Sequence, residues 1–227
     1  RQRQMCIRDR GVAEANMIGV AAGLAAMGKI PFTHSFTAFA SRRVCDQVTL
    51  SVAYAGLNVK MVGSDPGITA ELNGGTHMSM EDVSIMRNIP GMTVYEPVDS
   101  AQLRAAFPQI LAHDGPVYIR LLRRPAVRID SENDEFTLGK ASLLREGGDV
   151  TILATGIMVA EALLAAEELA GQGIGAEVLN VHTVKPFDEE AVLRSAMKTG
   201  AVVTAENASV IGCLLYTSDA ADDLLCV

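Results

Sequence analysis

The stretch "MTVYEPVDSAQLRAAFPQILAHDGPVYIRLL", from Met92 to Leu122, carries the pattern that predicts the fold class. It begins with a short apolar run stopped by Pro97, continues with helix-forming residues from Asp99 to His113, and ends in a second apolar run. Short apolar runs bounded by turn residues are typical of buried strands. Strands that alternate with helices in this way indicate a parallel sheet covered by helices on both faces.

The same alternation continues on both sides of this unit. Before it, the pattern predicts helices at Ala13–Met27, Ser41–Ala55 and Ser79–Asn88, and strands at Ile30–His34 and Asn58–Gly63. After it, the strands "DVTILATG", "AEVLNVHT" and "GAVVTAE" alternate with helices at Met158–Ala170 and Asp188–Lys198. Between the two runs, the polar stretch from Arg124 to Lys140 has the composition of a linker with room for one short strand.

We therefore expect an α/β protein with two doubly wound parallel-sheet domains. The first domain is predicted at residues 11–124 and the second at residues 141–212, with the linker at residues 125–140. The second domain is expected to be truncated, because we predict that the two ends of the chain, residues 1–10 and 213–227, are foreign to the fold.

The evidence for foreign ends comes from the codons that can encode them. The codons CGG CAG CGT CAG ATG TGT ATA AGA GAC AG encode Arg1–Arg10, and their reverse complement, read one base along, encodes "CLLYTSDAA", the sequence of Cys213–Ala221. Complementary strands of one DNA segment have no reason to encode both ends of a natural protein. The segment also resembles a sequencing-library adaptor read in translation. We therefore exclude both ends from fold prediction and expect an internal fragment of a longer protein.

The composition excludes several classes of protein. A net charge of -8 argues against nucleic-acid binding, which needs clustered Lys and Arg. The longest apolar stretch, Met17–Met27, is too short to span a bilayer, and no signal-peptide pattern occurs, so we expect no membrane partner and a cytoplasmic location. Only Cys45 lies outside the foreign ends, and one thiol makes neither a disulfide framework nor a metal cluster. We predict no metal site in this chain.

Glu14 is an acid at the front of the otherwise apolar segment "GVAEANMIGVAAGLA". Two interpretations are open for it. An acid in the first turn of a helix complements the helix dipole. Alternatively, a carboxylate held in an apolar pocket has a raised pKa and can share a proton with a ligand nitrogen.

Two phenylalanines and one histidine are further candidates. Phe36 and Phe39 either stack on a flat ligand ring or pack in the core. The stretch "SDPGITAELNGGTHMSMED", Ser64–Asp82, is longer than a plain connection and places His77 just before a helix. Ligands of open α/β sheets bind at the carboxyl ends of strands, where this loop is expected. His77 is therefore either a ligand-contacting side chain or a solvated loop residue.

In their order along the chain, several stretches resemble the pyrimidine-binding and C-terminal domains of transketolase. They are "GVAEANMIGVAAGLA", "PFTHSFTAFASR", "NGGTH", "GPVYIRLLR" and "NVHTVKPFDEE", and together they span Gly11–Gly212. The likeness is strongest to the separately encoded C-terminal subunit of split bacterial transketolases. The resemblance implies a thiamine-diphosphate-dependent enzyme of pentose phosphate metabolism that transfers a two-carbon ketol unit between sugar phosphates.

The resemblance also implies a role for each candidate residue. Glu14 would bind the aminopyrimidine of the cofactor and share a proton with it, and Phe39 would stack on that ring with Phe36 beside it. His77 would act on substrate oxygens, and Arg123 would grip the sugar phosphate through its bidentate guanidinium. Glu14 and His77 are thus the predicted catalytic residues.

Two positions depart from the family pattern. Asn73 stands where the family usually has Asp, which contacts a sugar hydroxyl, and Asp65 stands where it usually has His, near the substrate phosphate. Both are therefore expected at the substrate, but the identity of the sugar is put in doubt.

The resemblance finally implies partners. The half of the enzyme that binds the diphosphate and magnesium is absent from the sequence, so we expect activity only with a transketolase N-terminal subunit or domain, and a homodimer formed through the pyrimidine domain. A 1-deoxyxylulose-5-phosphate synthase or a 2-oxo acid dehydrogenase β subunit is the alternative within the superfamily, although "HTVKPFD" and the Arg123 segment favour transketolase. A catalytically silent assembly or regulatory subunit is the alternative of another class.

Overall fold

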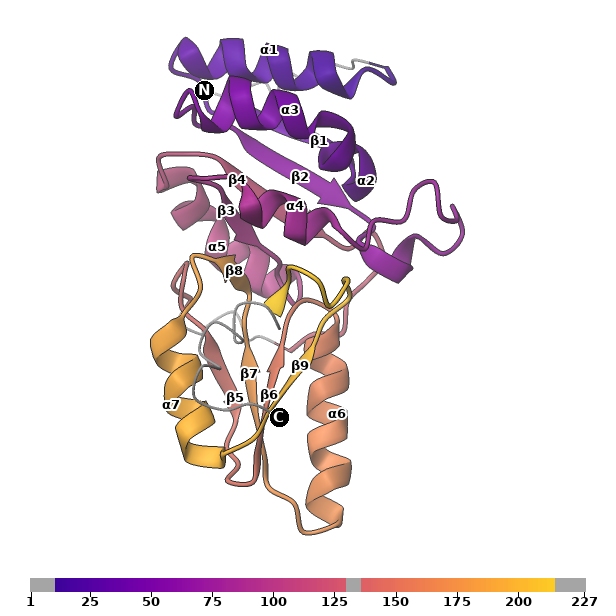
Figure 1. The fold of residues 1–227 in the computed structure, drawn as a ribbon, viewed down its shortest axis with the longest axis vertical. Helices are drawn as coiled ribbons and strands as arrows, with labels where there is room; N and C mark the ends of the chain where they lie inside the picture. Colours follow the sequence, from indigo (N-terminus) through magenta and orange to yellow (C-terminus); the bar gives the residue numbers. More distant parts are fainter. Residues whose placement is uncertain (1–10, 130–135, 215–227) are drawn as a thin grey trace.

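The computed structural model describes residues 11–129 and 136–214, which form two α/β units (Figure 1). The strands of the first unit's sheet are β1 (Phe32–Phe36), β2 (Lys60–Ser64), β3 (Thr93–Tyr95), β4 (Val117–Leu121) and β8 (Thr183–Lys185). Its helical segments are α1 (Glu14–Ala26), α2 (Thr37–Ala40), η1 (Arg42–Val44), α3 (Cys45–Gln47), η2 (Val48–Ala53), η3 (Gly67–Ala70), α4 (Asp82–Asn88) and α5 (Ser100–Ala112). The second unit contains β5 (Ser142–Arg145), β6 (Val150–Ala154), α6 (Met158–Gly171), β7 (Ala176–Asn180), α7 (Glu189–Thr199) and β9 (Val202–Ala205).

Both sheets are mainly parallel. The first sheet has the strand order β1-β2-β4-β3-β8 and the second has the order β5-β7-β6-β9. Within the first sheet only β8 runs antiparallel to its neighbour, and within the second only β5 does. The predicted α/β class with two parallel-sheet domains is confirmed, with an antiparallel strand at one edge of each sheet.

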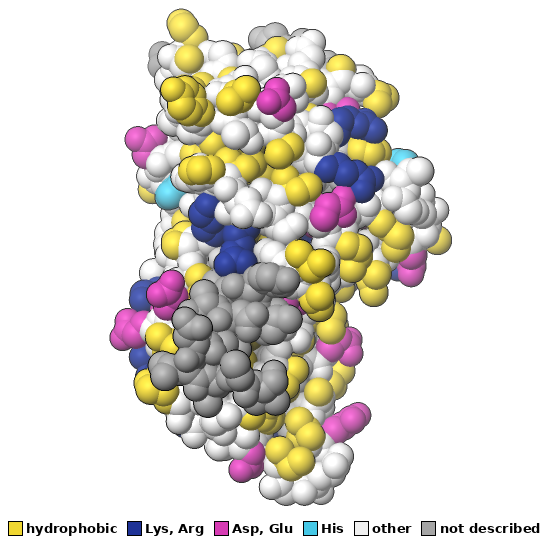
Figure 2. All heavy atoms as spheres, viewed as in Figure 1, with side chains coloured by type: hydrophobic (Ala, Val, Ile, Leu, Met, Phe, Trp, Pro, Cys, Tyr) yellow, Lys and Arg dark blue, Asp and Glu magenta, His cyan; other side chains and the backbone are white. Residues whose placement is uncertain are grey.

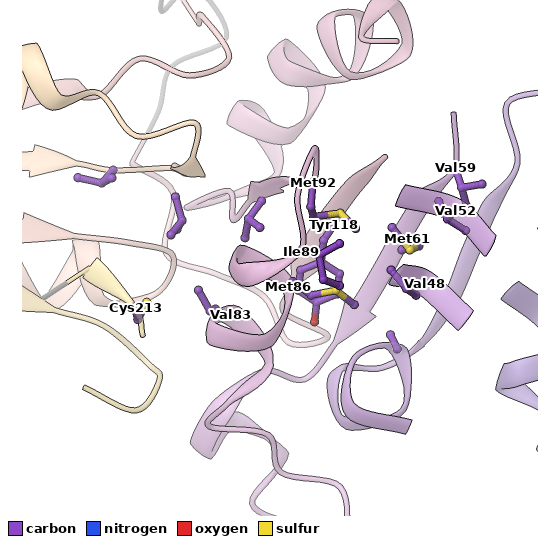
Figure 3. Close-up of a cluster of buried hydrophobic side chains, with 14 of the residues drawn as sticks. Val48, Val52, Val59, Met61, Val83, Met86, Ile89, Met92, Tyr118 and Cys213 are labelled. Atoms are coloured by element: carbon purple, nitrogen blue, oxygen red, sulfur yellow. The ribbon is translucent and has the colours of Figure 1, made fainter. Parts of the chain in front are cut away.

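Apolar residues on both faces of the first sheet explain why helices cover both. On one face, Met61 and Tyr118 belong to the same buried cluster as Val48 of η2 (Figure 3). On the other face, Ile119 packs with Ile110 of α5. Because successive side chains of a strand point to opposite faces, Tyr118 belongs to the first cluster and its neighbour Ile119 to the second.

The predicted helix Asp99–His113 is present as α5. Asp99 caps its start, with Oδ1 accepting hydrogen bonds from the backbone amides of Ala101 and Gln102, both at 2.9 Å. Pro108 lies inside the helix. The helix therefore continues through a residue that usually ends helices, as the sequence pattern predicts.

The segment predicted as one helix, Ser41–Ala55, is instead built from three short helical types in succession: η1 is a 3-10 turn, α3 is α-helical and η2 is a π-helix. The hydroxyl of Thr49 donates to the carbonyl of Cys45 at 2.7 Å, which is the carbonyl that an α-helix pairs with the amide of Thr49. At the end of the segment, the amide of Tyr54 donates to the carbonyl of Thr49, a bond that spans five residues as in a π-helix. The hydroxyl of Thr49 thus competes for a carbonyl that a regular α-helix would use, and the helix becomes wider from Val48 onward.

The predicted strand "AEVLNVHT" is divided between the two units. Its first part is β7, which lies in the second sheet and ends at Asn180. The chain then crosses back, and β8 pairs with β3 at the edge of the first sheet, with Val94 opposite Lys185. The ammonium of Lys185 donates to the backbone carbonyls of Arg87 and Ile89 at 2.8 and 2.7 Å, which ties this strand to the end of α4.

Most of the two predicted foreign ends, residues 1–10 and 215–227, lies outside the described residues. Cys213 and Leu214 are described, and both are buried in the larger apolar cluster. The origin of the ends and the domain boundaries remain predictions. In the part of the chain that the structure describes, no helix combines the length and apolar character needed to cross a membrane.

Candidate active site at the carboxyl edge of the first sheet

The predicted site residues lie where neighbouring parallel strands end. Phe36 is the last residue of β1, Asp65 directly follows β2, and Arg123 follows β4 by two residues. Open α/β sheets place their ligands at this carboxyl edge. In Figure 2, basic side chains, an acidic side chain and a histidine gather at the right of the upper half, where Figure 1 shows the long loop after β2.

Glu14 begins α1 and is only 7% exposed. Its carboxylate accepts hydrogen bonds from Arg43 Nη1 at 2.9 Å and from Ser35 Oγ at 3.2 Å. Burial raises the pKa of Glu14, but hydrogen bonds from Arg43, from its own backbone amide and from Ser35, together with the charge of Arg43, outweigh burial and hold the pKa below its ordinary value. The expectation of a raised pKa is therefore wrong for this arrangement of side chains, because the sequence did not reveal the cation beside the acid.

His77 meets both candidate phenylalanines. Its ring centroid lies 5.1 Å from that of Phe36 and 5.0 Å from that of Phe39, with the rings edge to face. The two phenylalanines themselves are 6.0 Å apart in the same arrangement. Thr76 Oγ1 lies within hydrogen-bonding distance, 2.9 Å, of Nδ1 of His77. The long loop thus returns to the sheet edge and places its histidine against the aromatic pair.

Arg43 contacts both the acid and an aromatic ring. Its Cζ atom lies 3.7 Å from the ring centroid of Phe39, while Nη1 binds Glu14. The face of Phe39 and the carboxylate of Glu14 therefore hold one flat, hydrogen-bond-donating group between them. Sequence reasoning missed this residue because its neighbour Arg42 looks identical in the sequence, yet Arg42 pairs with Glu81 at 2.6 Å.

The two residues that depart from the family pattern both contact Arg123. Its Nε atom lies 2.9 Å from Oδ2 of Asp65, and its Nη2 atom lies 3.5 Å from Oδ1 of Asn73. The contact with Asp65 is an ion pair and not a directed hydrogen bond, since Oδ2 has no hydrogen-bond partner. The Cζ atom of Arg123 is also 5.4 Å from the ring of Phe36. Asp65 thus already counters part of the charge that would attract an anion.

Asp65 adopts a backbone conformation that is unusual for a residue other than glycine, with φ at +54°. Its amide donates to the carbonyl of Leu121 at 3.1 Å, and its carbonyl accepts from Thr37 Oγ1 at 3.2 Å. Strained residues of this kind persist where the surroundings fix them. The surroundings fix Asp65 next to Arg123.

One continuous series of contacts joins every predicted site residue. It runs from Glu14 through Arg43 to Phe39, His77 and Phe36, and then through Arg123 to Asp65 and Asn73. A carboxylate that can accept a proton stands at one end, an arginine suited to anions stands at the other, and an aromatic wall lies between them. Among the described residues, no group of His, Cys, Asp and Glu side chains could hold a metal ion.

Comparisons with known proteins find matches to both units of the chain. Residues 2–127 match the transketolase pyrimidine-binding domain, and residues 139–214 match the transketolase C-terminal domain. A putative transketolase C-terminal section from Methanocaldococcus jannaschii is 46% identical over 207 residues, which cover 90% of this chain and 64% of the relative. One subunit of an apulose-4-phosphate transketolase from Phocaeicola vulgatus is 39% identical over 204 residues, which cover 89% of this chain and 65% of the relative.

A solved structure described as a split-gene transketolase, an inactive β4 tetramer, superimposes with a TM-score of 0.88 at 42% identity and covers 95% of this chain and 70% of that chain. Measured against the relatives from Methanocaldococcus jannaschii and Phocaeicola vulgatus, the chain spans slightly less than two thirds of their length.

Proposed function

The chain belongs to the transketolase family, and from this premise we propose that it is the aminopyrimidine-binding part of a thiamine-diphosphate-dependent transketolase. The reaction would transfer a two-carbon ketol unit between sugar phosphates. The observation that carries the proposal is the convergence of Glu14 and Phe39 on one flat group that donates hydrogen bonds.

The guanidinium of Arg43 indicates how well the site fits the cofactor. A guanidinium and an aminopyrimidine are both planar, both donate N–H bonds to a carboxylate and both stack on an aromatic ring. Glu14 and Phe39 therefore have the chemistry that the ring requires, once Arg43 turns aside. The side chain of Arg43 is 43% exposed, so it has a path into water.

Glu14 would hold a proton against a nitrogen of the ring. Bound thiamine diphosphate supplies the carbanion chemistry and the electron sink that the transfer of a two-carbon unit requires. When Arg43 leaves, the pKa of Glu14 rises, because the hydrogen bond and charge of Arg43 no longer oppose the effect of burial, although the backbone amide and Ser35 still do. A carboxylate with a higher pKa is better suited to share a proton near neutral pH. Phe39 and Phe36 would fix the plane of the ring and exclude water from it.

The other half of the site would hold the substrate. His77 stands beside the aromatic pair and would hydrogen-bond substrate oxygens near the ring, and Arg123 would bind the phosphate. Because Asp65 and Asn73 already contact Arg123, we propose that the preferred sugar phosphate differs from that of an ordinary pentose-phosphate transketolase. The relative named as acting on apulose 4-phosphate supports a less common sugar, because it matches this chain over both units.

The diphosphate and its magnesium ion would be held by a transketolase N-terminal subunit or domain. We propose that this chain is inactive alone, that it works in the cytoplasm, and that the first unit forms a homodimer. Exposed apolar side chains on that unit support a contact surface, and they include Leu24, Phe32, Leu50 and Tyr54. Two relatives, one named as a C-terminal section and the other as one subunit of a transketolase, support a separately encoded partner.

Calorimetry tests the requirement for a partner. The purified chain is titrated with thiamine diphosphate and magnesium, with and without a transketolase N-terminal subunit, and ketol transfer is measured in both mixtures. We expect micromolar binding and transfer only in the mixture. Transfer by the chain alone would refute the proposal of a half-site. Pyruvate with glyceraldehyde 3-phosphate, offered to the same mixture, tests for a deoxyxylulose-phosphate synthase instead.

Glu14→Gln tests the catalytic assignment in the assembled enzyme. An amide can hold the ring nitrogen but cannot exchange a proton with it. We expect hydrogen–deuterium exchange at the thiazolium carbon to slow by about a hundredfold or more, with cofactor affinity changed much less. The matched control is Glu81→Gln, which removes an acid that pairs with Arg42 where Glu14 pairs with Arg43. Exchange at the wild-type rate in Glu14→Gln would remove Glu14 from the mechanism.

A further inference from the structure

The loop that carries the substrate residues is bound by the second unit as well as by the first. Asn207 follows β9 of the second unit and is 4% exposed. Its Oδ1 atom accepts a hydrogen bond from the amide of Ile68 at 3.0 Å, and its Nδ2 atom donates to the carbonyl of Pro66 at 2.9 Å. One side-chain amide therefore pairs with both backbone groups on either side of Gly67, as a neighbouring strand would.

The backbone of Asn207 is fixed in turn by a buried arginine. Its carbonyl accepts a hydrogen bond from Nη2 of Arg120 at 2.8 Å. The Arg120 guanidinium also binds both carboxylate oxygens of Asp82 and both of Glu96, at 2.9 to 3.1 Å. A guanidinium held by two buried carboxylates has little freedom to move. Asn207 therefore projects its side chain from a rigid base.

The loop and Asn207 fit each other without spare room. Gly67 has φ at +53°, and a Cβ atom on it would lie 2.2 Å from Oδ1 and 2.4 Å from the backbone oxygen of Asn207. A side chain at this position would have to push Asn207 away. Only glycine both adopts this backbone conformation and leaves the approach open.

The clamped segment leads directly to the substrate end of the site. Pro66 follows Asp65, and Asp65 forms the ion pair with Arg123. Within the first unit, the amide of Asp65 donates to Leu121 and its carbonyl accepts from Thr37. From the second unit, Asn207 binds the carbonyl of Pro66 and the amide of Ile68, which follow Asp65 in the chain. A shift of the Pro66–Ile68 backbone would turn Asp65 and release Arg123 from its present position.

We propose that Asn207 is a positioning residue, by which the second unit sets the place of Asp65 and hence of Arg123 in the substrate-binding half of the site. The identity of the ligand as a phosphorylated sugar rests on the proposed function, but the clamp on the loop does not. The second unit then contributes to substrate selection although none of its described residues belongs to the site above.

The clamp is tested first in this chain without any cofactor. Amide hydrogen exchange of Ile68 and of the peptide 64–72 is measured in Asn207→Ala, which removes both bonds, and in Gly67→Ala, which acts on the same contact from the loop. We expect exchange in this segment to rise about tenfold or more in both variants, with little change in β2 and β4.

The control is Thr151→Ala. Thr151 is also a buried polar residue of the second unit, but its hydroxyl bonds to Ser195 and Thr199, away from the loop. This variant should leave exchange of the peptide 64–72 unchanged. If Asn207→Ala raises exchange evenly over the chain, or if Thr151→Ala opens the loop equally, Asn207 is an ordinary stabilising residue and the proposal fails.

The assembled enzyme tests the consequence for substrate. We expect Asn207→Ala to raise KM for a phosphorylated ketose about fivefold or more, with kcat and the cofactor Kd nearly unchanged, because Arg123 loses its set position. A ketol donor without phosphate should show no such change in KM. An equal rise in KM for both donors would overturn the proposal. A wild-type assembly without ketol transfer would overturn the proposed function instead, while the exchange experiment would still decide the clamp.

Discussion

The surroundings of Glu14 act on its pKa in opposite directions. Burial favours the neutral acid, and Arg43 with Ser35 favours the carboxylate and prevails. Because the folded pKa lies below the ordinary value, the pair contributes stability at neutral pH and loses it as the pH falls through the folded pKa. Arg43 is nearly half exposed, so solvent screens the pair and keeps that contribution small.

Arg43→Ala should raise the pKa of Glu14 in this chain. The substitution removes a hydrogen bond and a positive charge but leaves the burial of the acid in place. Carbon-13 NMR titration of the Glu14 carboxyl measures the pKa directly. Arg42→Ala is the matched control, because Arg42 pairs with Glu81. An unchanged pKa in Arg43→Ala, or an equal rise in both variants, would contradict the pairing that the structure shows.

Asn73→Asp should change the choice of sugar. The new carboxylate would bind Arg123 more strongly than the amide does now, and would give a charge-assisted bond to a sugar hydroxyl, worth roughly 1 kcal/mol or more. Steady-state kinetics with xylulose 5-phosphate, ribose 5-phosphate and other sugar phosphates would show an altered ratio of kcat/KM values. Equal ratios in wild type and variant, with ordinary turnover of the pentose phosphates, would show that Asn73 does not govern preference.

Individual contacts were the part of the site that sequence could least predict. Glu14, Phe36, Phe39 and His77 are predicted site residues because the stretches that contain them resemble a family in their order along the chain. Arg43 and Asn207 were not found, since a second arginine in "SRR" and an asparagine in "AENAS" have no distinguishing pattern. Their roles depend on which residues lie close to them in the folded chain, and sequence periodicity does not show such contacts.

Elements were predicted well where one pattern has one structural meaning. Apolar runs and helical spacing gave the strands and helices near their observed places, and Asp99 marked the start of α5. The run "NVHTVKP" was less informative, because a strand reads the same whether it extends its own sheet or crosses to another. The division of this run between β7 and β8 is set by tertiary contacts and not by local sequence. It depends on the partners of β8, which include the end of α4.

Lys185→Met should test how firmly β8 is tied to the first unit. The ammonium donates to the carbonyls of Arg87 and Ile89, at and just beyond the end of α4. Its removal should lower the free energy of unfolding by about 1.5–3 kcal/mol, the range for hydrogen bonds from a charged group. Chemical denaturation measures the change. Lys198→Met removes an exposed lysine that pairs with Glu146 and Glu177, and it should lower the free energy of unfolding by less, because solvent screens exposed ion pairs.

At the scale of the whole molecule, the interface between the units contains buried polar contacts beside its apolar ones. Arg120 and Glu96 come from the first unit, and Thr155 and Asn207 come from the second. Burial raises the pKa of Glu96 and the charge of Asp82 adds to this rise, while Arg120 opposes it. Gly156 leaves room for Glu96, since a Cβ atom there would lie 2.3 Å from Oε1. The two units are therefore fitted to each other and should unfold together.

Trimming the ends tests how much of the chain belongs to this structure. Removal of residues 1–10 and 215–227 should leave the melting temperature unchanged, because residues encoded by a foreign DNA segment were never selected to pack. Further removal of Cys213 and Leu214 should lower it by several degrees. Both side chains are buried, and burial of a leucine contributes about 1.5–3 kcal/mol, with each kcal/mol worth roughly 2–4 °C in a chain of this size. A melting temperature that falls at the first step would show that the outer residues contribute to the fold.

The position of β8 also constrains how the protein is synthesised. β3 leaves the ribosome long before its outer partner, so the growing first unit exposes a strand edge until Thr183–Lys185 emerges. An open edge can pair with the same edge of another nascent chain on a polysome. Fission of the gene between the two units would leave that edge exposed until a separately made second unit docked. Synthesis of β3 and β8 in one chain keeps the delay to the time taken to translate the residues between them.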